Sequence, residues 1–459
     1  MILITILLFI YFYFFTQVFK NSLNGDVYSI LLYIIIFLPI YSNFQLTIYK
    51  FSENEILVNL IKFSKDFLFY SIFFITLFGS SISFLKKKWN LSILDKLMFF
   101  LMLLILLFLI LPIGEADLIS RILYSKNLFL IGIVYFLGRQ RKISLQRLPI
   151  IFNVLIGLFV FYCIVSIFES LFGIHLHTFL EYANFNLYFN DIPASGNYQL
   201  SWTFERQGVL PRYGSLFADP LEFSASLLLA LSIALFYFIH SKIRNNQLIF
   251  LTLILFYMLG FYLSFSRSGI LGFILIILFT LIITKNYNVL VRLILSFSVL
   301  ILSYYYFSDL ETKYFIIDTL SFQNTSSLGH LFEWIEGIES MINNPLGIGL
   351  ATSGNASSVD QAIGIGGENQ FLIFGVQLGL LGIILYSSIL IKSIYNCAKL
   401  YMNENIYNLR MISFVACCTK IGLIIPLMTA NAEIYSFISL ITWFFVGYCE
   451  SYYQNLVIK

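Results

Sequence analysis

The sequence predicts an all-α polytopic integral membrane protein with about 12 to 13 transmembrane helices. Of its 459 residues, 59% are hydrophobic and only 11% are charged, which excludes a water-exposed surface of ordinary polarity. Apolar runs long enough to cross about 30 Å of hydrocarbon, at about 1.5 Å per residue, recur from end to end. We therefore expect a single membrane domain over residues 1–459, with no soluble domain of ordinary size between the spans.

The expected spans follow from these apolar runs. The first run has no basic segment before it and no small-residue cleavage site, so we interpret it as a retained span and not as a signal peptide. In chain order the expected spans are 1–19, 27–49, 67–85, 97–113, 122–137, 148–172, 221–239, 248–265, 269–284, 289–307, 371–391, 411–430 and 434–449.

The distribution of basic residues predicts the topology. The loop 138–147 carries Arg139, Arg141, Lys142 and Arg147 and no acid, which is typical of a cytoplasmic loop. Counting spans in both directions from this loop places the other basic loops, including the lysine triplet 86–88, on the cytoplasmic side as well. The same count places the N-terminus outside. Two long loops, 173–220 and 308–370, then face outward. Long loops on one face of a bundle usually carry the function, so the candidate residues are sought there.

The first external loop is rich in aromatic residues. Such rings suit the apolar face of a sugar, and they suit the headgroup region of a bilayer equally well. The residues concerned are Tyr182, Phe185, Tyr188, Phe189, Tyr198, Trp202 and Phe204.

The second external loop contains an amphipathic pattern. Apolar residues from Leu331 to Ile342 recur at helical spacing, with Ser326 or Ser327 able to cap the start and Asn344 before Pro345 ending the helix. We expect this helix to lie on the outer surface. The glycine-rich connection that follows it leads to Glu368 at the start of the next span.

Arg267 interrupts an apolar stretch. The uncharged run 248–284 is about twice the length that one span needs, and Ser266–Gly269 is its polar break, so we expect an outer elbow there. An arginine facing lipid costs roughly 2.5 to 3.5 kcal/mol on insertion scales. Arg267 therefore either snorkels to lipid phosphate or, at a helix start flanked by serines, binds a phosphate group of a ligand.

Arg212 enters the next span from the first external loop and can reach the same outer level. The planar fork of arginine matches phosphate oxygens, so two external arginines suggest a diphosphate. The alternative is that Arg206 and Arg212 pair with nearby acids, namely Glu205, Asp219 and Glu222.

Three further residues are candidates. Glu368, in "GGENQFL", has glycines before it that leave space for a substrate, so its carboxylate is a candidate general base; alternatively it caps the following helix. His330 is a candidate phosphate ligand or base, or else a surface residue. Lys420 lies inside a span, where an ammonium needs a partner or a cavity, and is a candidate substrate ligand.

No metal site or cofactor is expected. His175 and His177 have a His-x-His spacing, but no third ligand of the usual types is evident nearby. The glycines before Glu368 follow no strand and are not a dinucleotide fingerprint.

The order of motifs resembles the bacterial O-antigen ligase and polymerase superfamily of membrane glycosyltransferases, over roughly residues 200–390. The motifs are "PRYGSLFADPLEFS", "LSFSRSGILG", "GHLFEWIEGIESMINNPLGIGL" and "GGENQFLIFGVQLGLLGIILY". The resemblance implies a GT-C-like fold and a metal-independent, inverting glycosyl transfer. Ligases of this superfamily typically have histidine ahead of asparagine where this chain has Glu368 and Asn369, which favours a repeat-unit polymerase.

The resemblance also implies the partners and the place of action. Donor and acceptor would be glycans on undecaprenyl diphosphate in the bilayer of the bacterial inner membrane, with the active site facing the periplasm. Arg212 and Arg267, helped by His330, would stabilise the diphosphate, and Glu368 would deprotonate the acceptor hydroxyl. A chain-length regulator protein is an expected partner and nucleic acid is not. The alternatives are a ligase to lipid A core, an O-linked protein oligosaccharyltransferase, and a flippase of the lipid-linked oligosaccharide.

Overall fold

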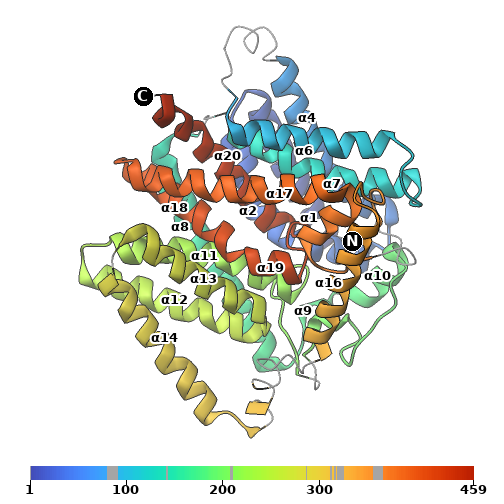
Figure 1. Cartoon of the computed structure of the whole chain (residues 1–459). Helices are drawn as coiled ribbons and strands as arrows, with labels where there is room; N and C mark the ends of the chain where they lie inside the picture. Colours follow the sequence, from blue (N-terminus) through green and yellow to red (C-terminus); the bar gives the residue numbers. More distant parts are fainter. Residues whose placement is uncertain are drawn as a thin grey trace.

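The chain folds into a bundle of helices (Figure 1). The computed structural model describes residues 2–79, 91–140, 143–206, 210–285, 287–310, 313–314, 317, 325–354 and 365–458. The described residues form no β-strand. They form only two isolated β-bridges, Ser195 with Leu200 and Glu205 with Pro211. The predicted all-α class is confirmed. The helices are α1 (Ile2–Leu23), α2 (Val27–Phe37), η1 (Leu38–Ile40), α3 (Tyr41–Ser52), α4 (Glu55–Gly79), α6 (Ile93–Ile110), α7 (Leu118–Gly138), η2 (Leu145–Arg147), α8 (Leu148–Phe172), α9 (Leu176–Phe179), α10 (Tyr182–Asn190), η3 (Trp202–Phe204), α11 (Pro220–His240), α12 (Arg244–Ser264), α13 (Arg267–Thr284), α14 (Tyr287–Phe307), α16 (Thr325–Asn343), α17 (Gln370–Asn403), α18 (Tyr407–Gly422), α19 (Ile424–Thr429) and α20 (Ser436–Ile458).

Every predicted span overlaps a helix, although α6 ends three residues before the predicted end of its span at 113 and α20 begins two residues after the predicted start of its span at 434. Fewer helices qualify as membrane spans than predicted. Ten segments of the described chain are long and apolar enough to cross a membrane, and α4, α14 and α20 are not among them. Helix α4 carries Lys62, Lys65 and Asp66 in its first half. Several predictions lie outside the described residues: residues 80–85 of the third span, the lysine triplet 86–88, Arg141 and Lys142.

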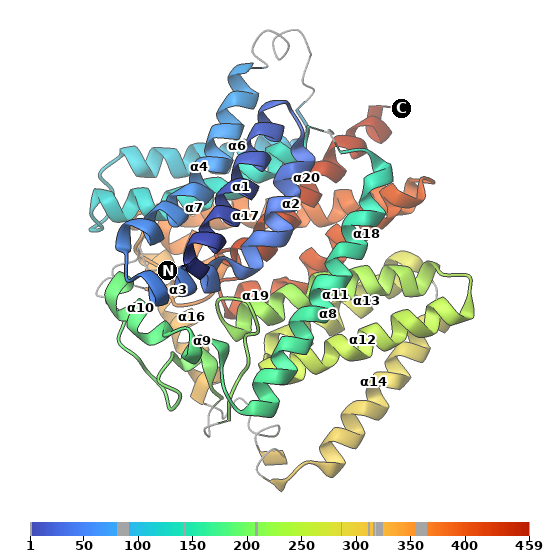
Figure 2. The ribbon, with the colours of Figure 1, turned by 180° about the vertical axis from the view of Figure 1, so that it is seen from behind.

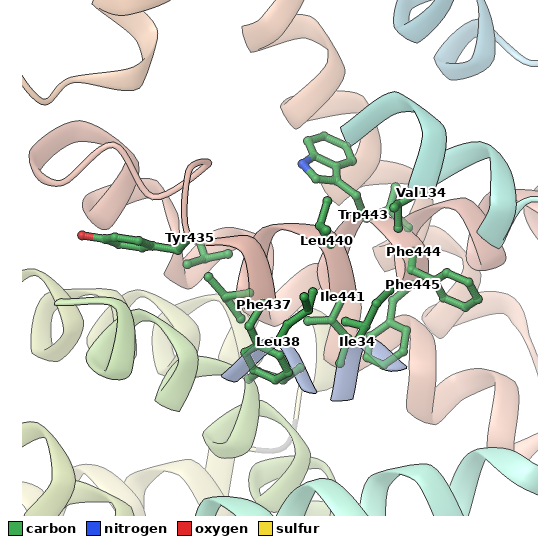
Figure 3. Packing of buried hydrophobic residues seen from close by; sticks show 14 of the residues in the cluster. Ile34, Leu38, Val134, Tyr435, Phe437, Leu440, Ile441, Trp443, Phe444 and Phe445 are labelled. Atoms are coloured by element: carbon green, nitrogen blue, oxygen red, sulfur yellow. The ribbon is translucent and has the colours of Figure 1, made fainter. Parts of the chain in front are cut away.

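Helix α20 lies in the centre of the bundle. Its side chains from Phe437 to Phe445 pack against Ile34 and Leu38 of the α2–η1 segment and against Val134 of α7 (Figure 3). Trp443, Ile441 and Phe445 have no exposed surface. Because α20 contacts protein and not lipid, it does not need the uniformly apolar surface of a lipid-facing span.

Glycines permit the close crossing of α7 and α20. A Cβ added at Gly447 would lie 2.0 Å from the carbonyl oxygen of Tyr135, and one at Gly138 would lie 2.2 Å from that of Phe444. Small residues at such crossings let helix backbones approach closely within a membrane bundle.

A buried ion pair joins the same region to α6. The carboxylate of Asp95 accepts hydrogen bonds from Arg139 Nε at 2.9 Å and Nη2 at 2.7 Å, and from the Tyr135 hydroxyl at 2.6 Å. Asp95 also closes a capping box with Ser92 at the start of α6. The bidentate geometry and full satisfaction of this fully buried carboxylate offset the cost of removing it from water.

Helix α17 is broken near its middle. Gly379 has φ 72° and ψ −170°, which interrupts the helical hydrogen bonds. The connection after α16 fills the break: Ile348 N–H donates to the Val376 carbonyl at 2.9 Å, and Leu380 N–H donates to the Pro345 carbonyl at 3.0 Å. Backbone groups freed inside a bundle must find such partners, so the break fixes the connection that follows α16.

The predicted amphipathic helix corresponds to α16, which ends at Asn343, directly before the predicted Asn344–Pro345 stop. The predicted cap at Ser326 or Ser327 is wrong, because both residues lie inside the described helix, which already includes Thr325. Helices α16, α9 and α10 lie at one side of the molecule and the C-terminus lies at the opposite side (Figures 1 and 2). Helix α14 runs away from the rest of the bundle in both views.

The glycine crossing gives a test of the fold. Gly447→Leu should lower the melting temperature of the purified protein in detergent, because the new side chain must displace the α7 backbone, at a cost of about 1 to 3 kcal/mol. Gly157→Leu is the matched control, since a Cβ at this exposed glycine of α8 meets nothing within 4 Å. Equal melting temperatures for the two variants would contradict the close crossing of α7 and α20.

Candidate active site

Arg267 lies at the predicted elbow. Helix α12 ends at Ser264, Phe265 adopts the left-handed conformation with φ 45°, and α13 begins at Arg267. The Ser266 side chain caps α13 by accepting from Gly269 N–H at 3.3 Å. Arg267 Nη1 donates to the hydroxyl of Ser327 on α16 at 3.3 Å, so the side chain is directed toward α16.

Gly269 holds the elbow against α11. A Cβ at this position would lie 2.0 Å from Ser224 Oγ and 2.6 Å from the ring of Phe261. The first turn of α13 can therefore approach α11 closely because it has no side chain there. This close contact fixes the position of Arg267 relative to the neighbouring helices.

Arg206 and Arg212 belong to a short hairpin that lies on the elbow. Within the hairpin, Arg206 N–H donates to the Leu210 carbonyl and Arg212 N–H donates to the Phe204 carbonyl, both at 2.8 Å. The hairpin is joined to the end of α12 by the N–H of Tyr213, which donates to the Leu263 carbonyl at 3.0 Å. The predicted approach of Arg212 to the level of Arg267 is thus seen in the structure.

The acids that could have paired with these arginines make other bonds. Glu205 Oε2 accepts from Asn197 N–H at 2.6 Å, Asp219 caps α11, and Glu222 Oε2 accepts from Ala218 N–H at 3.2 Å. In the described part of the chain, Arg212 has no carboxylate within 4.0 Å, the ion-pair distance. The alternative that Arg212 is neutralised by a local ion pair is not supported.

The three arginines are close enough to repel one another. Burial, followed by the positive charges of Arg267 and Arg206, lowers the pKa of Arg212 to about 10. Arg206 is only 4% exposed, with its guanidinium 5.2 Å from the ring centroid of Phe265. Arg206 is thus a member of the arginine cluster, in addition to the ion-pair candidate that its neighbours in sequence suggest, and the glycine and proline that follow it are typical of a turn returning to Arg212.

The histidines of the first loop support the arginine hairpin. His175 Nε2 lies 3.1 Å from the Arg212 carbonyl, and His177 Nε2 lies 2.8 Å from the Phe217 carbonyl. Burial lowers the pKa of His177 to about 4, so at neutral pH it is an uncharged donor to that carbonyl. Glu169 at the end of α8 accepts from the N–H groups of Leu176 and Ser215. Among the described residues, no three His, Cys, Asp or Glu side chains gather as a metal site.

Glu368 lies at the start of α17 but does not cap it. The cap is Asn369, whose side chain accepts from Phe371 N–H at 3.0 Å and Leu372 N–H at 3.4 Å. The capping alternative for Glu368 is therefore removed. Its carbonyl accepts from Asn431 N–H at 2.7 Å, which ties the segment to the loop before α20.

Two glycines bring Glu368 close to α16. Gly366 and Gly367 have φ values of 76° and 51°, and a Cβ at Gly367 would lie 2.1 Å from Glu333 Oε2. A Cβ at Gly366 would lie 3.2 Å from the Cα of Gly337, so the backbones themselves are in contact. Gly364, a third glycine that precedes Glu368, lies outside the described residues.

His330 faces Glu368 across this contact. Its Nδ1 lies 3.9 Å from Glu368 Oε2 and 3.6 Å from Glu333 Oε2. The carboxylate of Glu333, with a further contribution from Glu368, raises the pKa of His330 despite its partial burial. The positive charge of Arg267 also acts on His330 and opposes the rise in its pKa. The elbow and the start of α16 are therefore in one electrostatic environment.

Lys420 belongs to a different cluster. Its Nζ lies 3.8 Å from Glu433 Oε1 and 3.6 Å from the ring centroid of Trp443, and its side chain is 1% exposed. Glu433 also accepts from the Tyr386 hydroxyl at 2.7 Å and from the Trp443 indole. The ammonium inside a span thus has the partner it was expected to need. The predicted role of Lys420 in substrate binding stays a prediction.

The predicted residues other than Lys420 therefore meet in one place. The charges of Arg206, Arg267 and Glu368 all affect the pKa of Arg212. The charges of Glu368 and Arg267 also affect the pKa of His330. The site joins the α12–α13 elbow, the first-loop hairpin, and the starts of α16 and α17. It combines cationic groups that suit a polyanion with a carboxylate and an imidazole that suit proton transfer.

Residues 250–387 match the family model described as O-antigen ligase. The match supports the predicted resemblance to the O-antigen ligase and polymerase superfamily, and it includes Arg267, His330 and Glu368. Members of this family are glycosyltransferase-like enzymes, and the match supports a function of the ligase or polymerase type for this multi-pass membrane protein. No curated protein matches the chain.

Proposed function

We propose that the protein is a polymerase that joins undecaprenyl-diphosphate-linked repeat units into a surface polysaccharide. The observation that carries the proposal is the gathering of Arg206, Arg212 and Arg267 beside Glu368 and His330. Partly buried guanidinium groups that repel one another favour a ligand with more than one negative charge. A diphosphate in the outer leaflet of the bacterial inner membrane supplies such charges at the level of the elbow.

The arginines would act on the donor. Arginine binds phosphate oxygens through two parallel N–H groups, and a helix start such as that of α13 adds positive potential. When the bond between the anomeric carbon and the phosphate oxygen breaks, its electron pair passes to the diphosphate. Arg212 and Arg267 would stabilise that added negative charge in the transition state, which is where stabilisation increases the rate.

Glu368 would act on the acceptor. The hydroxyl at the non-reducing end of the incoming repeat gives its proton to the carboxylate as its oxygen attacks the anomeric carbon. The new glycosidic bond forms with inversion, and undecaprenyl diphosphate leaves. His330, beside both the carboxylate and the elbow, would contribute positive charge toward the diphosphate. A chain-length regulator protein would then set how many cycles occur.

The polymerase is preferred to a ligase because of Glu368. Ligases of the superfamily typically have histidine at this place, whereas this chain has a glutamate whose backbone carbonyl accepts from Asn431 N–H and which follows the glycine turn. A ligase to lipid A core remains the second candidate, because the family model is described as O-antigen ligase. A deletion strain separates them: loss of a polymerase leaves core lipid with a single repeat, and loss of a ligase leaves bare core with long chains on undecaprenyl diphosphate.

We expect Glu368→Gln to abolish chain growth, because the amide keeps the shape but cannot accept the proton. Arg267→Ala should abolish it as well, because one of the guanidinium groups facing the diphosphate is lost. The measurement is a gel of surface polysaccharide from the deletion strain complemented with each variant. Membrane insertion should be unchanged, and Glu336→Gln, an exposed acid on α16, should restore the wild-type ladder. A wild-type ladder with Glu368→Gln would remove Glu368 as the base.

The histidine predicts a pH dependence. Since Glu333 raises the pKa of His330, the imidazole stays positively charged to a higher pH than an isolated histidine does. Transfer activity that depends on this charge falls as pH rises through that raised pKa. Glu333→Gln lowers the pKa, so the falling limb of the pH profile should move to lower pH, while Glu336→Gln should leave it in place. An unmoved limb in Glu333→Gln would show that the charge of His330 is not used.

A further inference from the structure

A polar cavity lies beside the start of α17, and the residues that line it include none of the three arginines. It has a volume of about 110 Å³ and is lined by residues of α4, α7, α17 and α20 and of the loop before α20. A cavity needs a volume of only about 10 to 15 Å³ to hold one water molecule, so this cavity is several times larger than one water requires. None of the helices α4, α7 and α20 carries an arginine of the cluster.

The cavity is connected to Glu368 by the backbone. Gln370, which lines it, begins α17 two residues after Glu368. Asn431, which also lines it, donates its N–H to the Glu368 carbonyl at 2.7 Å. Glu368 is therefore joined through the backbone to two residues that line the cavity, and its Oε2 lies 3.9 Å from His330 Nδ1.

The walls of the cavity offer unused hydrogen-bonding groups. Both side-chain polar atoms of Asn431 and the Oε1 of Gln370 are buried and have no hydrogen-bond partner among the described residues, and each residue is only 1% exposed. Buried amides without partners are costly unless a ligand or water completes their bonds. Lys65 adds an ammonium that is in no ion pair with the described residues.

The remaining walls are partly polar and partly apolar, and Asn127, Glu433 and Ser436 are their polar residues. Aliphatic side chains of α7 and α20, together with the ring of Tyr124, line the cavity beside these polar groups. Donors and acceptors set among apolar and aromatic surfaces match a sugar ring, whose hydroxyls both donate and accept and whose faces are apolar.

We propose that this cavity binds one sugar ring of the acceptor glycan and presents the hydroxyl next to it to Glu368. The proposal rests on the proposed polymerase function, which supplies the glycan and the reaction. It adds a division of the site, in which the arginine cluster binds the donor and the cavity selects the acceptor. Gln370, Asn431 and Lys65 then determine specificity without touching the diphosphate.

The test uses the full-length protein in lipid nanodiscs. Donor repeat units on undecaprenyl diphosphate are held at saturation, and the acceptor is the free repeat-unit oligosaccharide released from the host's own polysaccharide. Gln370→Met and Asn431→Gly should each raise the acceptor KM about three- to tenfold, the loss expected for one hydrogen bond, with little change in kcat. Glycine is chosen at position 431 because Asn431 has φ 46°.

Three further variants separate an effect on the cavity from a general loss of structure. Leu440→Phe fills the cavity while keeping every polar group, and it should raise the acceptor KM in the same way. Lys65→Met should raise it as well, whereas Lys62→Met is the matched control, because Lys62 lies over the Phe189 ring at 4.5 Å and does not line the cavity. An unchanged acceptor KM in Gln370→Met, Asn431→Gly and Leu440→Phe, alongside an inactive Glu368→Gln, would show that the cavity holds only water.

Binding without transfer separates this proposal from the function on which it rests. Saturation-transfer NMR should detect the free oligosaccharide on the wild-type protein and on Glu368→Gln, and should lose the signal with Gln370→Met and Leu440→Phe. That pattern supports the cavity even if the wild-type protein forms no polymer. Equal signals for all four proteins, or no signal with the wild type, would overturn it.

Discussion

The repulsion among Arg206, Arg212 and Arg267 is the interaction on which the rest of the site depends. Arg206 is buried and Arg212 and Arg267 are partly buried, and the acids nearest to the hairpin in sequence accept from backbone N–H groups. Bringing like charges together in this way costs free energy that a bound polyanion offsets. Under the proposed function, the multiply charged ligand that offsets this cost is the diphosphate of the lipid-linked donor.

The surrounding structure fixes the positions of the charged groups through backbone contacts. Gly269 lets the elbow lie against α11, and Gly366 and Gly367 let the Glu368 segment lie against α16. The break of α17 at Gly379 is filled by the connection from α16, so α16, which carries His330, is tied to α17, the helix that follows Glu368. Positioning by rigid backbone contact suits a reaction in which the acceptor hydroxyl must be aligned with the anomeric carbon.

Much of the fold and part of the site could be predicted from local sequence. The elbow at Arg267 followed from the length of an apolar run, and the amphipathic helix followed from its periodicity. Contacts between distant segments could not be predicted. Glu433 is the partner of Lys420 only because the loop before α20 folds back, and Asn431 contacts Glu368 for the same reason. The central place of α20 was also hidden, since periodicity cannot distinguish a helix buried by protein from one facing lipid.

The most direct test of the account is the binding of undecaprenyl diphosphate, without a glycan, to the full-length protein in nanodiscs, measured by native mass spectrometry. The wild-type protein should bind it more tightly than undecaprenyl monophosphate. The double variant Arg212→Ala, Arg267→Ala should bind it at least about tenfold more weakly, because two charge-assisted contacts are lost. Equal affinity of the wild-type and double-variant proteins would contradict the assignment of the arginine cluster to the diphosphate.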